Sequence, residues 1–323
     1  MWKVCPGGMS ALQLRQIDRA VVTGPTGAVG SALCRRLLDE GASVWAVVRP
    51  HCRRLNALPK HEKLHIVECD VSELTSLPEK MASVSVDALF HLAWAGTTGA
   101  GRNDMPAQID NIRYTIDAVH AASALGASVF VGTGSQAEYG RAEGALTART
   151  PAFPENGYGM AKLCAGEMSR AECKKLGISH VWARILSVYG PHDTPASMIS
   201  HVVAALLDGE KPALTAGVQL WDYLYSDDAA RALYLCARSG RDGAIYPLGG
   251  GHARPLKEYI EILRNAIDPA LPLGLGEIPY GAGQVMHLEA DLTDLTRDTG
   301  FKPAVSFEEG IRKTIDWMKG ERT

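Results

Sequence analysis

The sequence predicts an α/β protein with a doubly wound parallel sheet and a smaller C-terminal α/β lobe. In the first 186 residues, short apolar runs alternate with stretches of helical periodicity. Such alternation is typical of strand–helix–strand units, whose strands pair in parallel and are covered by helices. In the second half of the chain, prolines interrupt this regular pattern. We therefore expect the sheet mainly in the first half and the smaller lobe after it.

The expected elements alternate along the chain. Strands are expected at residues 19–23, 43–48, 64–67, 88–91, 128–131 and 180–185. Helices are expected at residues 28–40, 72–77, 106–125 and 158–176. A glycine follows three of these helices, and a left-handed glycine commonly ends a helix, so we expect this role for Gly41, Gly126 and Gly177.

The composition is that of an ordinary globular protein. Of the 323 residues, 46% are hydrophobic and 21% charged, and the net charge of −3 offers no basic field to nucleic acid or an anionic membrane. No uninterrupted apolar stretch reaches the roughly 18–20 residues of a membrane span. Seven cysteines are scattered without paired spacing. We therefore expect reduced thiols, a cytoplasmic location and no metal site.

A glycine turn joins the first expected strand to the first expected helix. Thr23 and Gly24 end the apolar run, and Gly27 and Gly30 follow at three-residue intervals. Glycines let the backbone approach a pyrophosphate closely, and the N-terminus of the helix offers unpaired N–H groups to its negative charge. Similar spacing also occurs at ordinary turns. In this strand–turn–helix context the motif predicts a dinucleotide-binding, Rossmann-like fold.

A second motif places a phenol and an ammonium one helical turn apart. Tyr158 and Lys162 form a Tyr-x-x-x-Lys pattern near the start of an expected helix, on one face of it. A tyrosine with a pKa near 10 is a poor acid or base at neutral pH. A neighbouring lysine favours the phenolate and lowers this pKa toward the working range. The alternative for such a pair is an ordinary solvated helix face.

The two motifs, in this order, resemble those of the extended short-chain dehydrogenase/reductases. This family includes nucleotide-sugar epimerases, dehydratases and 4-keto reductases, and the resemblance covers nearly the whole chain. The other matching segments are residues 69–71, 91–94, 134–140, 184–191, 222–228 and 300–311.

The resemblance implies roles for individual residues. Tyr158 is the implied acid or base, Lys162 lowers its pKa and holds the nicotinamide ribose, and Ser135 binds the reacting hydroxyl or carbonyl. Cofactor contacts are expected at Gly24, Thr26, Gly27, Ala28, Val29, Gly30, Arg49, Asp70, Val71, Leu92, Ala93, Trp94, Asn111, Thr133, Tyr158, Lys162 and Leu186. Substrate contacts are expected at Thr97, Ser135, Gln136, Ser187, His192, Trp221 and Arg254. The glycine-rich loop at 94–102 follows the carboxyl end of an expected strand, where ligands bind in open α/β sheets, so we expect a mobile cover of the substrate, with a plain flexible loop as the alternative.

Arg49 bears on the choice of cofactor. It follows the second expected strand, where an acidic residue commonly binds the ribose 2′-hydroxyl of NAD and an arginine accommodates the 2′-phosphate of NADP. Arg53 and Arg54 follow closely. The sequence thus favours NADP(H). NAD(H) stays open, because an arginine can also stack on the adenine, and a solvated basic loop is the remaining alternative.

Two departures from the family pattern narrow the reaction. In the 4,6-dehydratases an Asp-Glu pair that transfers protons follows the threonine at the position of Ser135, whereas this chain has Gln136 and Ala137. Trp221 and Ser187 replace an arginine and an asparagine that contact the diphosphate or the sugar in many relatives. The first departure disfavours the dehydratase reaction. The second puts the usual pose of a nucleotide diphosphate in question.

The leading expectation is an NAD(P)-dependent oxidoreductase acting on a nucleotide-diphospho-sugar, as a 4-keto reductase or a 4-epimerase. A carbonyl reductase of a non-nucleotide substrate is the alternative that the substitutions at 187 and 221 allow. A non-catalytic cofactor-sensing protein is a third possibility. Tyr158 and Lys162 speak against it, because this role usually accompanies loss of the tyrosine or the lysine.

The resemblance also implies the domain organisation. Residues 1–16 form an N-terminal extension, in which Met9 is an alternative initiator, and residues 17–186 form the cofactor-binding domain. Residues 187–323 mainly form the substrate-binding lobe, and the runs 220–225 and 244–248 are expected to return to the main sheet. The helices at 106–125 and 158–176 are expected to pair with a second copy in the four-helix bundle of a homodimer.

Overall fold

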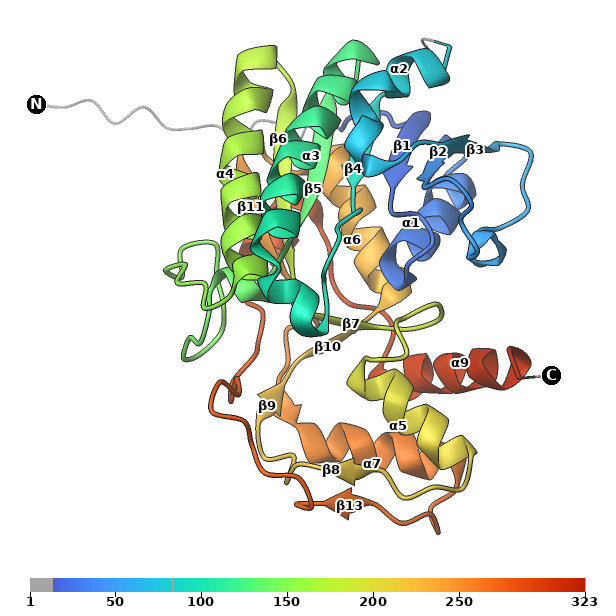
Figure 1. Ribbon diagram of the computed structural model, residues 1–323, viewed down its shortest axis with the longest axis vertical. Helices are drawn as coiled ribbons and strands as arrows, with labels where there is room; N and C mark the ends of the chain where they lie inside the picture. The colour runs from blue at the N-terminus through green and yellow to red at the C-terminus, as the bar shows by residue number, and fades with distance from the viewer. Residues whose placement is uncertain (1–13, 83, 323) are drawn as a thin grey trace, which may run out of the picture.

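Seven parallel strands form the central sheet of the computed structural model, which describes residues 14–82 and 84–322 (Figure 1). Residues 1–13 of the expected N-terminal extension, Met9 among them, lie outside the described residues. In order across the sheet the strands are β11 (Ala244–Leu248), β6 (Ser179–Ile185), β5 (Val129–Ser135), β4 (Ala88–His91), β1 (Arg19–Thr23), β2 (Ser43–Val48) and β3 (Leu64–Glu68). The order reverses between β1 and β4, as in a doubly wound sheet.

Helices cover both faces of this sheet (Figure 1). On one face lie α1 (Ala28–Asp39) and α6 (Ser226–Ser239), and on the other lie α2 (Leu77–Lys80), α3 (Met105–Ala124) and α4 (Gly157–Leu176). Side chains of β1 alternate between the two cores, since Ala20 and Val22 pack on the α1 side and Val21 packs on the α3 side. Burial of both faces explains why the strands are continuous apolar runs. The expected fold class is confirmed.

The three glycines expected to end helices do so in the structure, but one expected helix has a different form. Gly41, Gly126 and Gly177 have φ angles of 88°, 77° and 72° and follow α1, α3 and α4. The helix expected at 72–77 is instead a 3₁₀ helix, η2 (Val71–Ser76), followed by the single turn of α2. The Asp70 side chain caps η2, and Glu73 inside it has non-helical backbone angles, which prevent one continuous α-helix.

The strand β5 extends beyond the expected range of 128–131, because two glycines that resemble turn residues lie inside the strand and make room for a neighbouring ring. Gly132 and Gly134 lie within β5 against the indole of Trp182 on β6, where a Cβ atom on either glycine would come within 2.3 Å of the ring. A Cβ atom on Gly166 of α4 would lie 2.8 Å from the same ring. Because β5 continues past these glycines, Ser135 is its last residue, at the carboxyl edge of the sheet.

The C-terminal lobe is built around α5 (Met198–Leu207), α7 (Leu256–Ile267) and α9 (Phe307–Gly320). Its core includes the aromatic rings of Tyr189, Tyr225, Tyr259 and Phe307. Three pairs of short strands complete it: β7 (Ser187–Tyr189) with β10 (Tyr223–Tyr225), β9 (Leu220–Trp221) with β12 (Arg254–Pro255), and β8 (Ala213–Leu214) with β13 (Gly274–Leu275).

Only one of the two expected returns to the main sheet occurs. β11 pairs with β6 and extends the main sheet. Residues 220–225 instead form β9 and β10, which pair with β12 and β7, so that expectation is wrong. Asp222 separates the two strands, and its carboxylate accepts hydrogen bonds from the backbone nitrogens of Gly250, Gly251 and Ala290.

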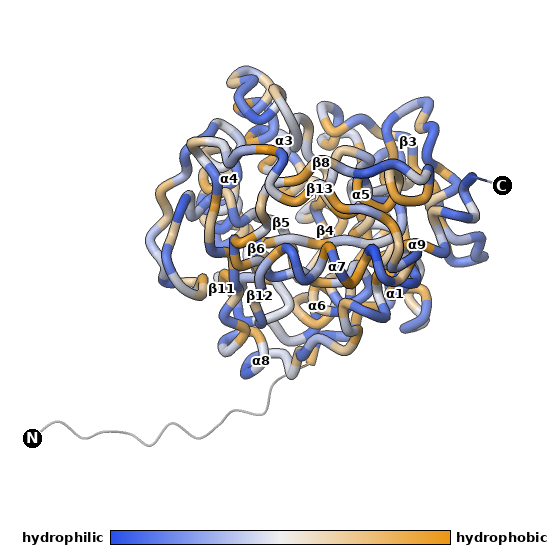
Figure 2. The backbone as a smooth tube through the Cα atoms, turned by 90° about the horizontal axis from the view of Figure 1, so that it is seen from below, coloured by the Kyte–Doolittle hydropathy of each residue, from blue (hydrophilic) through white to orange (hydrophobic). Residues whose placement is uncertain are grey.

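Hydrophobic segments concentrate where the strands and helices pack, and hydrophilic stretches lie mainly at the periphery (Figure 2). Within residues 14–82 and 84–322, no helix combines the length and apolar character that a membrane crossing requires. The six cysteines of the described part of the chain are all free thiols.

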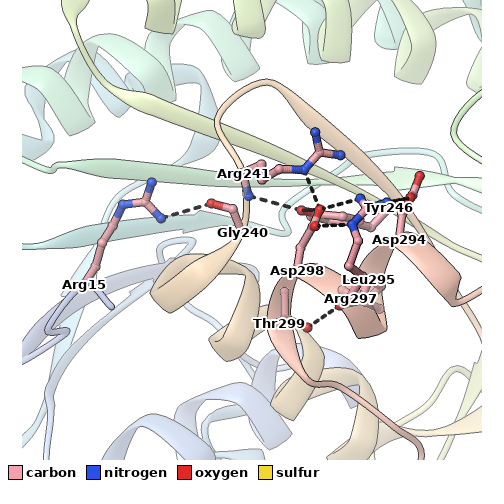
Figure 3. Close-up of polar contacts among 9 residues, drawn as sticks. All are labelled: Arg15, Gly240, Arg241, Tyr246, Asp294, Leu295, Arg297, Asp298 and Thr299. Carbon is pink, nitrogen blue, oxygen red and sulfur yellow. Dashed lines mark hydrogen bonds and ion pairs between the residues drawn. The ribbon is translucent and has the colours of Figure 1, made fainter. Parts of the chain in front are cut away.

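A buried carboxylate joins the last strand of the sheet to α8 (Thr293–Thr299), as Figure 3 shows. Asp298 accepts hydrogen bonds from Arg241 Nε at 2.6 Å, from the Tyr246 hydroxyl at 2.8 Å and from Arg297 Nε at 2.8 Å. Burial would raise the pKa of Asp298, but the hydrogen bonds from Arg297, Arg241 and Tyr246 outweigh it and lower this pKa to about 2. The ionised carboxylate therefore fastens α8 to β11 and to the turn before it.

Replacing Asp298 by asparagine should destabilise the protein in a pH-dependent way. The pKa of this carboxyl is lower in the folded protein than its ordinary value of 3.8, so its stabilising effect is full above pH 4 and disappears as the pH falls toward 2. We expect Asp298→Asn to lower the free energy of unfolding by about 2 kcal/mol at pH 7, measured by urea denaturation. The difference from the wild type should shrink below pH 4.

The control for this prediction is Asp294→Asn, which removes a more exposed partner of Arg297. We expect this variant to lose less than about 1 kcal/mol. Equal losses in the two variants, or a loss in Asp298→Asn that does not depend on pH below 4, would contradict the role given to Asp298.

Candidate active site

The glycine turn lies at the carboxyl end of β1, where the strand order reverses and where ligands bind in open α/β sheets. Gly24 has a φ of 67°, and a Cβ atom there would lie 2.8 Å from the backbone nitrogen of Ala93. A Cβ atom on Gly30 would lie 2.2 Å from the Gly24 oxygen, whereas one on Gly27 would meet nothing within 4 Å. The turn is therefore closely packed on one side and open at the N-terminus of α1, where an anionic group can bind.

Two cavities meet at this turn and share Gly24 and Trp94. We call the first, of about 360 Å³, the tyrosine-side cavity and the second, of about 440 Å³, the arginine-side cavity. The predicted site residues that line the tyrosine-side cavity are Gly24, Gly27, Ala28, Val29, Gly30, Leu92, Trp94, Thr97, Thr133, Ser135, Tyr158, Lys162 and Leu186. Those that line the arginine-side cavity are Gly24, Thr26, Arg49, Asp70, Val71, Ala93 and Trp94.

The loop after β4 is fastened by two buried amide side chains of α3. Asn111 Oδ1 accepts a hydrogen bond from Ala95 N at 3.0 Å, and Asn111 Nδ2 donates one to Ala95 O at 2.9 Å. Gln108 Nε2 donates to Gly96 O and to Gly101 O, and Gln108 Oε1 accepts from Trp94 Nε1. Asn111 thus shapes the loop and does not line either cavity, and the loop expected to be mobile is held by these bonds. Sequence reasoning missed Gln108, although it lies three residues before Asn111, on the same helix face.

The three residues expected to carry the chemistry meet at the tyrosine-side cavity. Ser135 ends β5, and Tyr158 and Lys162 lie one turn apart at the start of α4. Lys162 Nζ donates a hydrogen bond to Thr133 O at 2.6 Å. The same nitrogen lies 3.8 Å from the ring centre of Trp94 and 5.9 Å from that of Tyr158. The ammonium is therefore nearer to the indole than to the phenol.

Burial shifts the ionisation of both Tyr158 and Lys162. It raises the pKa of Tyr158, while hydrogen bonding from Ser135 and the positive charge of Arg102 oppose that rise. Burial lowers the pKa of Lys162 to about 7, and the negative charge of Glu138 opposes this change. Arg102 is thus a neighbouring cation that lowers the pKa of Tyr158, and the same role for Lys162 stays a prediction.

A buried ion pair supports the end of β5. Glu138 belongs to η4 (Gln136–Glu138), and its Oε2 lies 2.6 Å from Nε of Arg184; the two side chains are 0% and 4% exposed. Oε1 of the same carboxylate accepts hydrogen bonds from Ser135 N at 2.7 Å and from Trp182 Nε1 at 3.1 Å. Glu138 therefore fixes the backbone at Ser135. Gln136, which starts η4, is half-buried and lines neither cavity.

A third cavity, of about 300 Å³, lies in the C-terminal lobe, and we call it the lower cavity. Trp221 lines it, and its Nε1 donates a hydrogen bond to Ser187 Oγ at 2.8 Å. The two side chains that replace the family's arginine and asparagine therefore bind each other. The described residues that line the lower cavity include no charged side chain: Met198, Ala213, Leu214, Thr215, Gln219, Trp221, Tyr223, Leu256, Ile260, Ile278 and Gln284.

Two residues expected to contact the substrate have other partners. The His192 ring packs against that of Trp317, with ring centres 4.9 Å apart, and its carbonyl accepts a hydrogen bond from Arg54. Arg254 forms an ion pair with α9. Asp193, the neighbour of His192, lines the tyrosine-side cavity instead. Both residues follow the Gly190-Pro191 segment, for which the sequence suggests a place near the substrate, and His192 has a left-handed backbone with a φ of 65°.

Comparisons with known proteins show which family and which solved structures the chain is similar to. The model of the NAD dependent epimerase/dehydratase family matches residues 20–249. A dTDP-glucose 4,6-dehydratase of Streptomyces griseus is 26% identical over 319 residues, with 94% of each chain covered. A UDP-N-acetylglucosamine 4-epimerase from Methanobrevibacter ruminantium M1, in complex with UDP-N-acetylmuramic acid, has a TM-score of 0.85 at 23% identity, covering 95% of this chain and 100% of that one.

A further solved structure shares the fold. A UDP-glucuronic acid 4-epimerase from Bacillus cereus in complex with NAD has a TM-score of 0.81 at 21% identity, covering 94% of this chain and 100% of that one. At these identities, the two solved structures establish a common fold and no common substrate.

Replacing Glu138 by glutamine should destabilise the protein strongly, although the side chain keeps its size. The substitution leaves the buried Arg184 guanidinium without a negative partner. We expect a loss of about 3–5 kcal/mol in the free energy of unfolding, measured by urea denaturation. The control is Glu155→Gln, which breaks the exposed pair with Arg141 and should cost less than about 1 kcal/mol. Similar losses in both variants would show that the Glu138 pair does not support the site.

Proposed function

The chain belongs to the NAD dependent epimerase/dehydratase family, and from this premise we propose that it transfers hydride between a nicotinamide cofactor and carbon 4 of a nucleotide-linked sugar, as a 4-keto reductase or a 4-epimerase. The observation that carries this proposal is the convergence of Ser135, Tyr158 and Lys162 with the glycine turn on one cavity. A binding place for a nicotinamide cofactor, a proton-transferring phenol and room for the reacting carbon would thereby be brought together.

The two connected cavities fit a dinucleotide. The glycine turn leaves no room for a Cβ atom at Gly24 or Gly30, and the N-terminus of α1 faces the open space at Gly27. Arg49 and Asp70 line the arginine-side cavity, where they would hold the adenosine part, and Thr133, Lys162 and Leu186 line the cavity that would hold the nicotinamide riboside. When bound, the nicotinamide supplies or accepts the hydride.

The chain's own residues handle the proton. During reduction, the Tyr158 hydroxyl donates its proton to the carbonyl oxygen of the sugar, and during oxidation the phenolate takes a proton from the sugar hydroxyl. Ser135 donates a hydrogen bond to the same oxygen, and the Glu138 carboxylate fixes the Ser135 backbone. Lys162, held by the carbonyl of Thr133, orients the ribose.

The segment after Ser135 disfavours a 4,6-dehydration, although dTDP-glucose 4,6-dehydratases are among the relatives. Loss of water requires an acid and a base beside the reacting carbons in addition to the phenol. Gln136 has no titratable group, and Ala137 is a buried methyl. Glu138 is the next carboxylate along this segment, but Arg184, Trp182 and the Ser135 nitrogen occupy both of its oxygens.

We propose NADP(H) as the preferred cofactor, on the basis of two guanidinium groups. Arg49 and Arg54 both line the arginine-side cavity, where a ribose 2′-phosphate would find opposite charge and hydrogen-bond donors. The solved Bacillus cereus relative is in complex with NAD, but at 21% identity that structure shows a shared fold and not the cofactor preference of this chain. An enzyme that exchanges NADPH at each turnover fits a reductase, whereas an epimerase must retain its cofactor between the two hydride transfers.

A carbonyl reductase of a non-nucleotide substrate is the second candidate, favoured by the Trp221–Ser187 hydrogen bond. In this chain neither residue offers a charge to a diphosphate, and the lower cavity is lined by apolar side chains and neutral polar groups. Such a cavity suits an uncharged, largely apolar tail. A panel that includes free 4-keto sugars and simple ketones beside UDP- and dTDP-linked hexoses separates the two candidates.

A homodimer is also proposed, on the basis of apolar side chains exposed on two adjacent helices. Ile109 of α3 is 64% exposed, and Met160 and Met168 of α4 are each 49% exposed. Because α3 and α4 lie side by side, these side chains offer one surface that a second copy could cover with the same two helices.

Replacing Tyr158 by phenylalanine should remove the proton donor and leave the cavity otherwise intact. We expect the rate on the best substrate of the panel to fall about 100- to 10,000-fold. Product formation is measured by NMR, which detects epimers as well as reduced sugars. Cofactor affinity should stay within about threefold of the wild type, because the lost hydroxyl is a minor part of the cofactor contacts.

The matched control is Tyr234→Phe on α6, outside the cavities, which should keep the wild-type rate. Full activity in Tyr158→Phe would refute the assignment of the acid or base. Equal losses in both variants would indicate a general effect of removing tyrosine hydroxyls on the fold.

The cofactor prediction is tested on the purified protein. After denaturation, the released nucleotides are identified by mass, and NAD(H) and NADP(H) affinities are measured for the wild type and Arg49→Met. We expect little retained NAD, a wild-type preference for NADP(H), and a roughly 10- to 100-fold loss of NADP(H) affinity in the variant with NAD(H) affinity nearly unchanged. Near-stoichiometric NAD in the isolated protein would instead indicate an epimerase and refute this role of Arg49.

A further inference from the structure

The lysine of the Tyr-x-x-x-Lys motif gives the phenol little electrostatic support in this chain. Lys162 Nζ is bound by the Thr133 carbonyl and lies over the Trp94 indole, so its nearest partners are groups other than Tyr158. Burial also lowers the pKa of this ammonium to about 7, and near neutral pH a substantial fraction of it is uncharged. A second cation near the phenol that stays charged at every pH would therefore stabilise the phenolate when Lys162 is uncharged.

Arg102 is such a cation. Its Cζ atom lies 4.5 Å from the ring centre of Tyr158, within the range of a cation–π contact. The guanidinium stays protonated at every pH at which the protein is folded. A phenolate ring carries more negative charge than a phenol ring, so a cation above its face stabilises the ionised form more than the neutral form.

The fold holds Arg102 in this position from two sides. The η3 helix (Gly99–Asn103), which contains Arg102, is bound at Gly101 O by the buried Gln108 amide. One residue after Arg102, Asn103 Oδ1 accepts a hydrogen bond at 3.0 Å from Gly157 N, at the start of the helix that carries Tyr158. The Asn103 side chain therefore ties the segment that carries Arg102 to the start of the helix that carries Tyr158.

We infer that Arg102 is a positioning residue that stabilises the ionised form of Tyr158, and that it shares with Lys162 the task that the motif assigns to the lysine. This inference rests on the proposed role of Tyr158 as acid or base. It concerns a residue outside both sequence motifs, placed by the loop after β4.

Other charged and polar groups around Tyr158 fix the sign of the effect. Hydrogen bonding from Ser135 acts in the same direction as Arg102, and the negative charge of Glu138 acts against both. Lys162 contributes only while protonated, and Asp193, which lines the same cavity, adds negative charge if it ionises. Removing the Arg102 charge should therefore raise the pKa of Tyr158, and the pH range over which the phenolate exists should move upward.

The test follows Tyr158 directly and needs no substrate. The protein is labelled with ¹³C at the tyrosine Cζ position and saturated with NADP⁺, and the Tyr158 signal is identified by its absence in Tyr158→Phe. The signal is then titrated with pH in the wild type, Arg102→Met and Arg102→Lys. We expect the midpoint to rise by roughly one pH unit in Arg102→Met and by clearly less in Arg102→Lys, which retains the charge.

The matched control is Arg238→Met, which removes a guanidinium lying over the Tyr234 ring outside the cavities. It should leave the Tyr158 midpoint unchanged. An unchanged midpoint in Arg102→Met, or equal shifts in Arg102→Met and Arg238→Met, would each overturn the inference. A confirmed shift together with full activity of Tyr158→Phe would uphold the electrostatic contact and refute the proposed function, so the two failures are distinguishable.

Discussion

The site depends on the close approach of the chain at the ends of β1 and β4. The Thr23 hydroxyl accepts hydrogen bonds from the backbone nitrogens of Leu92 and Ala93, each at 3.2 Å, and Gly24 leaves no space for a side chain beside Ala93. This contact forms the wall that the two cavities share. If the two strand ends moved apart, the glycine turn after β1 and the loop that carries Trp94 would no longer line the same cavities.

Most of the fold could be predicted from the sequence, because strands that are buried on both faces of a sheet consist of continuous apolar runs. The glycine turn and the Tyr158–Lys162 pair could be found because each has a fixed local spacing. The end of β5 could not, because Gly132 and Gly134 have the composition of a turn and their reason lies in Trp182, about fifty positions away. The contact of Arg102 with Tyr158 joins the segment after β4 to the start of α4 through tertiary packing, so no local spacing in the sequence predicts it.

The buried charges of the site form a linked set. Glu138 is held by Arg184 and in turn holds the backbone of Ser135, which places a full negative charge close to Tyr158 and Lys162. That charge helps the ammonium of Lys162 to exist in a buried position, but it opposes ionisation of the phenol. The arrangement thus stabilises one partner of the motif at the expense of the other, and an additional cation outside the motif restores the balance.

The packing around Trp182 constrains how this chain can diverge. One indole occupies the space that side chains would need at Gly132, Gly134 and Gly166, on two different elements. None of these four positions can change freely by itself, since a larger residue at any glycine collides with the ring and a smaller residue in place of Trp182 leaves a void beside the three glycines. In descent they should therefore vary together. A relative that has lost the tryptophan should carry side chains at the glycines, and such joint substitution would mark lineages whose serine-bearing strand is supported in a different way.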